Sequence, residues 1–310
     1  MSAQTKSSAP TLLLVAALWL HFFWCLVPAW ISSEYYSYGF FVPPLVFALA
    51  WRRNASPVVS APWQPGRATV VVLALLAGLA LLALIPMRVV QTGDPGWRPT
   101  FVLHGLVVTV ASHLLLARER GWKGSAWFLP ITVLAWSAVP YIGRIEQELI
   151  RSLTGIVIGI TREIFIIGGH PVEQVGERLS LGGQVVEVTE GCSGIRSIQS
   201  LVMTALFFGE LLWLRWPQRL LLLGGAMAAA VICNTARAFY LSWISFFEST
   251  AAADAAHDPA GHLAFAAAAL MLYLFAYLLA PGRSRRAQVR RIQVTPSQAP
   301  PPGNTSQNVP

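Results

Sequence analysis

Charged residues are scarce in this sequence, and several patterns expected of soluble or cofactor-binding proteins are missing. Only 12% of the 310 residues are charged, against about 25% in soluble domains, which excludes an ordinary soluble fold. Basic residues are not interleaved with aromatic ones, so nucleic-acid binding is set aside. The Cys and His residues do not follow a metal-ligand spacing. We therefore predict neither a metal ion nor another cofactor.

The apolar residues, 55% of the chain, gather in blocks of about 20, the length that spans a bilayer core. The blocks cover residues 11–31, 38–51, 68–87, 100–117, 125–142, 192–214, 219–247 and 262–281. The second is short and contains Pro43-Pro44, so we expect it to be broken, tilted or re-entrant. The first is too long for a signal peptide and is expected to be retained. This pattern predicts an all-α polytopic membrane protein with about eight transmembrane helices.

The distribution of charge predicts the orientation of these helices. With the N-terminus in the cytoplasm, most of the 22 basic residues fall in inner segments. Of the 14 acidic residues, only Glu119 and Glu210 fall there. Both termini are therefore expected to be cytoplasmic under the positive-inside rule. The formal net charge of +8 then reflects membrane topology.

Two long segments lie outside the apolar blocks. Residues 143–191 are expected to form an extracytoplasmic part of a transmembrane domain that covers residues 1–282. Its stretch IEQELIRSLTGIVIGITREIF has helical periodicity, which predicts an amphipathic helix along the membrane surface. Glycine pairs and β-branched residues further on predict a hairpin. Residues 283–310 are basic and then rich in Pro, Ser, Gln and Asn, which predicts a disordered cytoplasmic tail.

Cys192 is the candidate nucleophile, because a thiol between flexible residues at the outer end of a helix does not serve as a helix cap. The alternatives are a small buried hydrophobe, as expected of Cys25 and Cys233, or a disulfide with Cys233 in an oxidising periplasm. Ser193 is a rival nucleophile, but the G-x-S-x-G pattern fails because Ile195 follows Gly194.

Two arginines and two histidines are predicted to lie near the same outer face. Arg237 sits in an apolar helix, where arginine is costly and usually faces a polar cavity; the alternative is that it snorkels to the headgroups. Asn234, three positions earlier on that helix, can orient it. Arg196 lies at i+4 from the thiol and either lowers its pKa or snorkels. His257 is expected in an outer loop at 248–261, and His262 competes with it for a proton-transfer role.

Three short motifs follow one another at the predicted outer ends of helices. GCSGIRSIQSL contains Cys192, CNTARAFYL has an N-x-x-R spacing that ends at Arg237, and HDPAG places H-x-x-x-G on His257 and Gly261. The block EYYSYGFFVPPLVFALAWRR precedes them. With these motifs, residues 30 to 281 resemble the exosortase/archaeosortase family, eight-span membrane proteins proposed to be cysteine transpeptidases that process C-terminal sorting signals such as PEP-CTERM.

The resemblance implies a catalytic role for three residues. Cys192 would attack a peptide carbonyl and form an acyl-enzyme. Arg237 would donate to the oxyanion, since arginine cannot act as a base, and His257 would transfer protons. Supporting roles would fall to Asn234, Arg196, Ser193, Gly194 and Gly261.

The same resemblance implies exported protein substrates with a C-terminal motif, an apolar helix and a basic end. They would be processed at the outer face of the bacterial inner membrane, in connection with exopolysaccharide or surface-protein export. Whether an amine or water resolves the acyl-enzyme stays open. Tyr38 and Gly191 replace the His and Ala of many members, which leaves the subfamily and its sorting signal open.

Two rival classes remain. A non-catalytic component of a polysaccharide or protein export system would need no aligned Cys, Arg and His. A transporter is expected to place its polar residues near the bilayer midplane.

Overall fold

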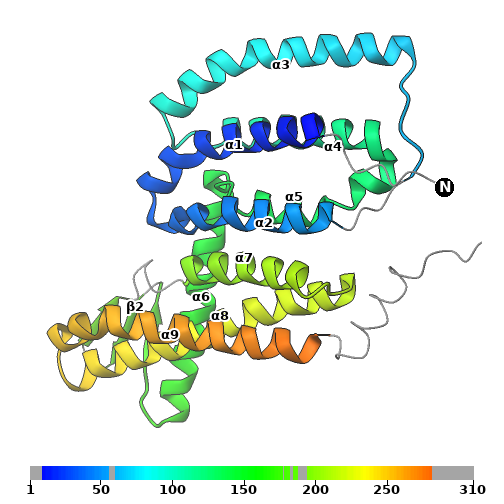
Figure 1. The fold of residues 1–310 in the computed structure, drawn as a ribbon. Helices are drawn as coiled ribbons and strands as arrows, with labels where there is room; N and C mark the ends of the chain where they lie inside the picture. Colours follow the sequence, from blue (N-terminus) through cyan, green and yellow to red (C-terminus); the bar gives the residue numbers. More distant parts are fainter. Residues whose placement is uncertain (1–8, 56–59, 177, 182–183, 188–193, 281–310) are drawn as a thin grey trace, which may run out of the picture.

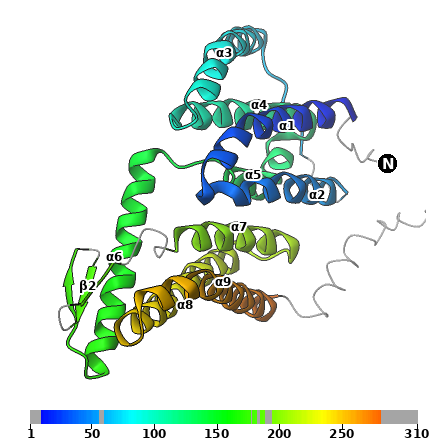
Figure 2. The ribbon, with the colours of Figure 1, turned by 90° about the vertical axis from the view of Figure 1, so that its left-hand side faces the viewer.

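The computed structural model describes residues 9–55, 60–176, 178–181, 184–187 and 194–280 (Figure 1). The helices are α1 (Ala9–Ser32), η1 (Glu34–Phe41), α2 (Val42–Asn54), α3 (Arg67–Gly93), α4 (Pro99–Ala126), α5 (Leu129–Trp136), α6 (Gly143–Ile167), α7 (Ile195–Leu211), α8 (Trp216–Phe247) and α9 (Thr250–Leu279); the strands are β1 (Glu173–Val175), β2 (Arg178–Leu181) and β3 (Gln184–Glu187). In both views α6 runs steeply across the direction shared by α1, α4 and α7 (Figure 2).

Several of these helices are long and apolar enough to cross a membrane. Within the described residues, α1, α3, α4, α8 and α9 meet that condition by length and composition. The helices α2, α5 and α7 are shorter, with 13, 8 and 17 residues. The prediction of a helical polytopic membrane protein is therefore confirmed, and a small sheet is added to it.

Proline lies at helix boundaries in two of the predicted spans. The second is broken, because the 3₁₀-helix η1 gives way to α2 at Pro43-Pro44, where a missing N–H costs nothing at a helix start. The fifth was predicted over 125–142. Gly121, with a φ of +69°, kinks α4, and the residues after this kink continue through Trp127 and Phe128 into α5 as one helical stretch. Pro130 occupies the first turn of α5, and the stretch ends at Trp136, short of the predicted residue 142 and before Pro140.

The prediction of an outer loop at 248–261 was wrong, because α9 begins at Thr250. The side chain of Ser249 accepts a hydrogen bond from the backbone N–H of Ala252 at 3.1 Å and caps the helix. The alanine-rich turns that follow have high helix propensity. Pro259 lies inside the helix without ending it. His257 is consequently on a helix.

Buried side chains form three clusters. The first joins α1, η1, α2, α4 and α5 around residues such as Phe22 and Phe101. The second joins α7, α8 and α9 around Leu201, Leu222 and Leu272. The third joins α6, the strands and the final turns of α8. The third cluster lies at the end of the molecule where α8 meets α9.

The segment before α7 confirms two local predictions. The amphipathic stretch forms α6, which buries one side against α8 through Phe165 and its ring contacts with Phe239, Trp243 and Phe246. Its other side exposes an isoleucine stripe at Ile156, Ile160, Ile164 and Ile167. The predicted hairpin is part of a three-stranded antiparallel sheet in the order β1-β2-β3. Val175 pairs with Arg178, and Leu181 pairs with Gln184.

The end of the molecule away from the sheet holds a closed cluster of charges. The carboxylate of Glu210 accepts from Arg53 on α2, with Nη2 to Oε2 at 2.7 Å, and lies 3.0 Å from Nη2 of Arg219 on α8. The side chains of Arg53 and Glu210 are 4% and 2% exposed. The Arg53 guanidinium also lies 4.3 Å from the ring centre of Trp127. We call Arg53, Glu210 and Arg219 the buried charge cluster.

Candidate active site

The structure brings Arg237 and His257 into direct contact. Nη2 of Arg237, on α8, lies 2.9 Å from Nε2 of His257, on α9, and 3.4 Å from the backbone oxygen of His257. Arg237 is half-buried, and the side chain of His257 is 40% exposed. Two residues twenty positions apart in the chain thus meet across the hairpin of α8 and α9.

The partners of His257 fix its tautomer when the ring is neutral. Arginine only donates hydrogen bonds, so Nε2 of His257 must be the acceptor. The proton therefore sits on Nδ1, which faces Oδ1 of Asp258 at 3.1 Å and donates to it. Asp258 is a site residue to which the motif HDPAG assigns no role. The signal was its place directly after His257, but a neighbouring acid is too common to be diagnostic.

Glycine is needed where α7 begins. Gly194 precedes α7 with a φ of +71°, a conformation that favours glycine. A Cβ at this position would lie 2.7 Å from Cγ of Asn234. Asn234 is buried and so packs directly against the backbone at the start of α7. This contact fixes α7 against α8, one turn from Arg237.

Gly261 gives the guanidinium of Arg237 a flat surface to lie on. A Cβ at Gly261 would stand 3.4 Å from both Cζ and Nη2 of Arg237. That distance is an ordinary van der Waals contact, so a methyl group just fits and a longer side chain would not. Gly261 follows His257 by one helical turn and lies on the same side of α9.

These residues line a cavity of about 600 Å³. Its walls come from η1, the first turns of α7, one residue of α8 and the first half of α9. The predicted site residues on the walls are Gly194, Arg196, Arg237, His257, Gly261 and His262. Aromatic and apolar side chains such as Tyr38, Phe41 and Phe265 complete it. We call this space the site cavity.

Arg196 lies at the rim of the site cavity and is paired with an acid. Its Nη2 bonds a carboxylate oxygen of Glu34 on η1, and both side chains are exposed. Glu34 is a second residue that sequence reasoning missed, because it lies 162 positions away in the chain. The pair joins η1 to α7 at the mouth of the cavity.

The candidate nucleophile lies outside the described residues. Cys192 and Ser193 fall between β3 and Gly194, where the description of the chain stops at residue 187 and resumes at 194. The other two cysteines, Cys25 and Cys233, are free thiols. Sγ of Cys233 lies 3.8 Å from Sδ of Met271, at a contact between α8 and α9.

The hairpin of α8 and α9 extends well beyond the Arg237–His257 pair. Ten residues of α8 follow Arg237, which is about 15 Å of helix. This extension carries the aromatic side chains that contact Phe165 of α6. The part of α8 beyond the pair, at the tip of the hairpin, therefore packs against α6.

A network of polar contacts supports the same end of the molecule. Arg98 forms an ion pair with Glu146 at the start of α6 and donates to the backbone oxygen of Tyr141 at 3.0 Å. The hydroxyl of Tyr36 accepts from the backbone N–H of Tyr141 at 2.9 Å. The network ties η1 to the start of α6.

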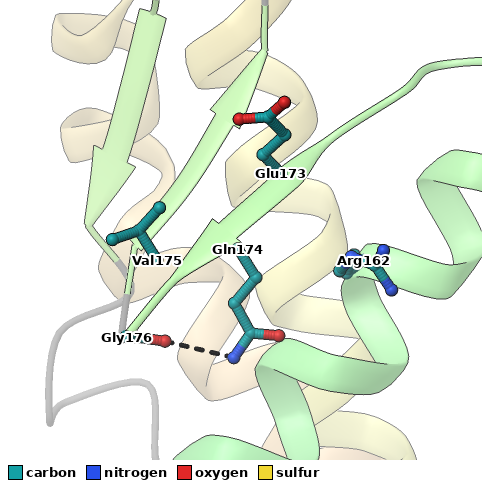
Figure 3. A pocket seen from close by; sticks show the side chains of 5 residues that line it. All are labelled: Arg162, Glu173, Gln174, Val175 and Gly176. Carbon is teal, nitrogen blue, oxygen red and sulfur yellow. Dashed lines mark hydrogen bonds between the residues drawn. The ribbon is translucent and has the colours of Figure 1, made fainter.

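A second hollow lies away from these residues, between α6 and β1 (Figure 3). Arg162 of α6 lines it together with residues of the strand, and Gln174 Nε2 donates to the backbone oxygen of Gly176 at 3.1 Å. Glu173 and Val175 complete its lining. The hollow is shallow and open, and it contains none of the motif residues.

A scan against protein families matches residues 30–274 to the family described as transmembrane exosortase. Neither the comparison with curated proteins nor the comparison with solved structures gave a match. The family match covers most of the chain and includes every motif residue named above. The chain therefore belongs to the transmembrane exosortase family.

Proposed function

We propose that this protein is a membrane cysteine transpeptidase or peptidase that cleaves C-terminal sorting signals of exported proteins. The observation that carries the proposal is the contact between Arg237 and His257 in the wall of the site cavity, within a chain of the exosortase family. The family implies a cysteine transpeptidase role. The residues that the motifs assign to that role include the two that meet here.

Cys192 is the nucleophile in this proposal. Two peptide units separate it from Gly194, so the chain can carry its Cα at most about 7 Å from that wall of the site cavity. An unperturbed thiol has a pKa near 8.5. The charge of Arg237, which lines the same cavity, would favour the thiolate.

The first chemical step forms an acyl-enzyme. The thiolate attacks the peptide carbonyl carbon, a C–S bond forms, and the carbonyl oxygen becomes an oxyanion that accepts from Arg237. The C–N bond then breaks, and the leaving amine takes the proton that His257 received from the thiol. An incoming amine or water attacks the thioester and restores the thiol.

The resting contact between Arg237 and His257 gives a reason for the order of these events. Nε2 of His257, the nitrogen that must exchange protons, accepts from Arg237 before substrate binds. An oxyanion attracts the guanidinium more strongly than a neutral imidazole does. Binding of the substrate carbonyl would draw Nη2 away and free Nε2 to take the thiol proton before the attack; the oxyanion then holds Nη2, while Asp258 keeps hold of Nδ1.

The proposal places the site cavity on the outer face of the bacterial inner membrane. Eight passes with both termini in the cytoplasm agree with the basic inner segments. They require η1 with α2, the short α5 and α7 to cross together with the five longer helices. The isoleucine stripe of α6 then faces the headgroup region, as an amphipathic helix does. Substrates would present a C-terminal motif, an apolar helix and a basic end, in connection with exopolysaccharide or surface-protein export.

Substitution of the three cysteines tests this function. Cys192→Ala should insert normally and stop processing of a co-expressed substrate that ends in a sorting signal. Cys25→Ala and Cys233→Ala are matched controls and should retain most of the processing. A membrane-impermeant thiol reagent should label Cys192 from outside the cell. Processing at the wild-type rate by Cys192→Ala, or labelling only after permeabilisation, would contradict the proposal.

A further inference from the structure

Three side chains of types that commonly bind metals meet between α1 and α4, away from the site cavity. His21 and Cys25 are four residues apart on α1, which places them on one side of that helix. His104 comes from α4. The candidate ligand atoms of the three residues all lie within 4.8 Å of one another. The three residues do not follow a metal-ligand spacing in the sequence, because Cys25 and His104 are 79 positions apart.

Burial makes this cluster unusual. Cys25 is completely buried and His104 is 2% exposed. Nδ1 of His104 is buried and makes no hydrogen bond among the described residues. A buried polar atom without a partner is costly, particularly inside a membrane, and calls for an explanation. His21 is exposed on the surface of α1.

The spacing agrees with ligation of one ion. Sγ of Cys25 lies 3.7 Å from Nε2 of His21, too long for a strong hydrogen bond. Typical metal–sulfur and metal–nitrogen lengths of about 2.3 Å and 2.0 Å, at a trigonal angle, separate the two ligand atoms by about 3.7 Å. The imidazole of His104 packs edge-on against Phe22, with ring centres 5.0 Å apart. A small rotation about its side-chain bonds would close the third ligand distance.

Charge selects the kind of ion. A thiolate and two neutral imidazoles carry one negative charge, so a monovalent ion gives a neutral complex and a divalent ion leaves a net positive charge in an apolar site. Thiolate and imidazole are also ligands that suit Cu(I).

We propose that His21, Cys25 and His104 form a binding site for a soft monovalent metal ion, Cu(I), that ties α1 to α4. The site is independent of the site cavity and of the proposed peptidase reaction. Binding requires loss of the Cys25 thiol proton to solvent and no change in the oxidation state of the metal. Because the ion binds only the folded pair of helices, it should raise thermal stability.

The test uses the full-length protein in detergent with Cys192→Ala and Cys233→Ser, which leaves Cys25 as the sole thiol. The protein is titrated with Cu(I) against a colorimetric chelator under reducing conditions, and with Ag(I) as a redox-inert probe. One equivalent of either metal ion should bind, raise the melting temperature and protect Cys25 from alkylation. His104→Gln and Cys25→Ser should each abolish the binding of that equivalent.

His113→Gln is the matched control, because His113 lies on the same helix and is held by Ser125 and Thr132. It should keep the full equivalent of Cu(I). Size-exclusion profiles like that of the parent show that each variant is folded. Absence of tight Cu(I) binding, binding that survives His104→Gln, or displacement of Cu(I) by equimolar Zn(II) would overturn the proposal.

Discussion

Two arginine-containing clusters lie at opposite ends of the molecule and differ in what surrounds them. In the buried charge cluster, Glu210 accepts from both Arg53 and Arg219, and the acid and Arg53 are almost fully buried. At the site cavity, Arg237 faces the imidazole of His257 and a space of about 600 Å³. The first cluster pairs its two arginines with one shared carboxylate. The second holds its positive charge beside an open cavity.

The difference separates a structural role from a catalytic one. A buried ion pair holds helices in register, and losing one partner leaves a charge without compensation. An arginine beside a histidine and a cavity can instead change partner when a substrate develops negative charge. Substitutions at the two ends should therefore affect different quantities: stability at the buried charge cluster and turnover at the site cavity.

Loss of the imidazole should have the largest effect on turnover. General acid–base catalysis contributes about 10²–10⁴ in rate, so His257→Ala should slow substrate processing by a factor in that range. His262→Ala is the matched control on the same cavity wall and should change the rate much less. Processing rates at equal membrane levels measure both. The opposite ranking would move the acid–base role to His262.

Exchange of Arg237 for lysine should have the second largest effect on turnover. Loss of one oxyanion donor costs about 10²–10³ in rate, and an ammonium does not reproduce the planar guanidinium. Arg237→Lys should therefore lower turnover by about that factor while the melting temperature stays near wild type. A residue that only snorkels to headgroups would tolerate lysine, so full turnover in a well-expressed variant would remove Arg237 from the site.

At the other end, Glu210→Ala should act on stability. The substitution leaves Arg53 and Arg219 buried without their shared carboxylate, which typically costs about 3–5 kcal/mol. The melting temperature in detergent should fall clearly, while the rate per folded molecule should remain close to wild type. A strong loss of turnover with unchanged stability would contradict the division between the two ends.

The smallest contrast concerns two glycines of the site cavity. Gly194→Ala forces a side chain into a positive φ and against Asn234, so it should lower both stability and turnover. Gly261→Ala adds a methyl group at ordinary contact distance from Arg237 and should be nearly silent. Gly261→Leu should then displace the guanidinium and slow processing. Equal effects of the two alanine variants would show that the contact with Asn234 does not position α7.

Sequence reasoning succeeded where a local pattern decides the structure. Helical periodicity predicted α6, and Pro43-Pro44 predicted the break before α2. It failed where a cap or a distant residue decides. The Ser249 cap and the alanine run carry helix through His257, although the polar HDP stretch suggested a loop. The end of α5 at Trp136 precedes Pro140, which an apolar average does not register.

In the candidate site, too, residues to which a local motif assigns a role were predicted and their other neighbours were not. The motifs named Arg237 and His257, and the structure places them in contact. Their neighbours Asp258 and Glu34 were missed: both stand inside quoted stretches, HDPAG and the block that begins EYYSYGFF, but no motif assigns a role to either position. The cluster of His21, Cys25 and His104 was missed as well, since only tertiary packing of α1 against α4 brings it together.

The most direct measurement is to trap the covalent intermediate. Purified protein is incubated with a peptide that carries a sorting signal, quenched in acid and examined by intact and peptide mass spectrometry. The account predicts an acyl adduct on Cys192 that neutral hydroxylamine removes, that His257→Ala and Arg237→Lys form more slowly, and that Glu210→Ala still forms. Substrate cleavage without any adduct on Cys192, or an adduct on Ser193 instead, would contradict it.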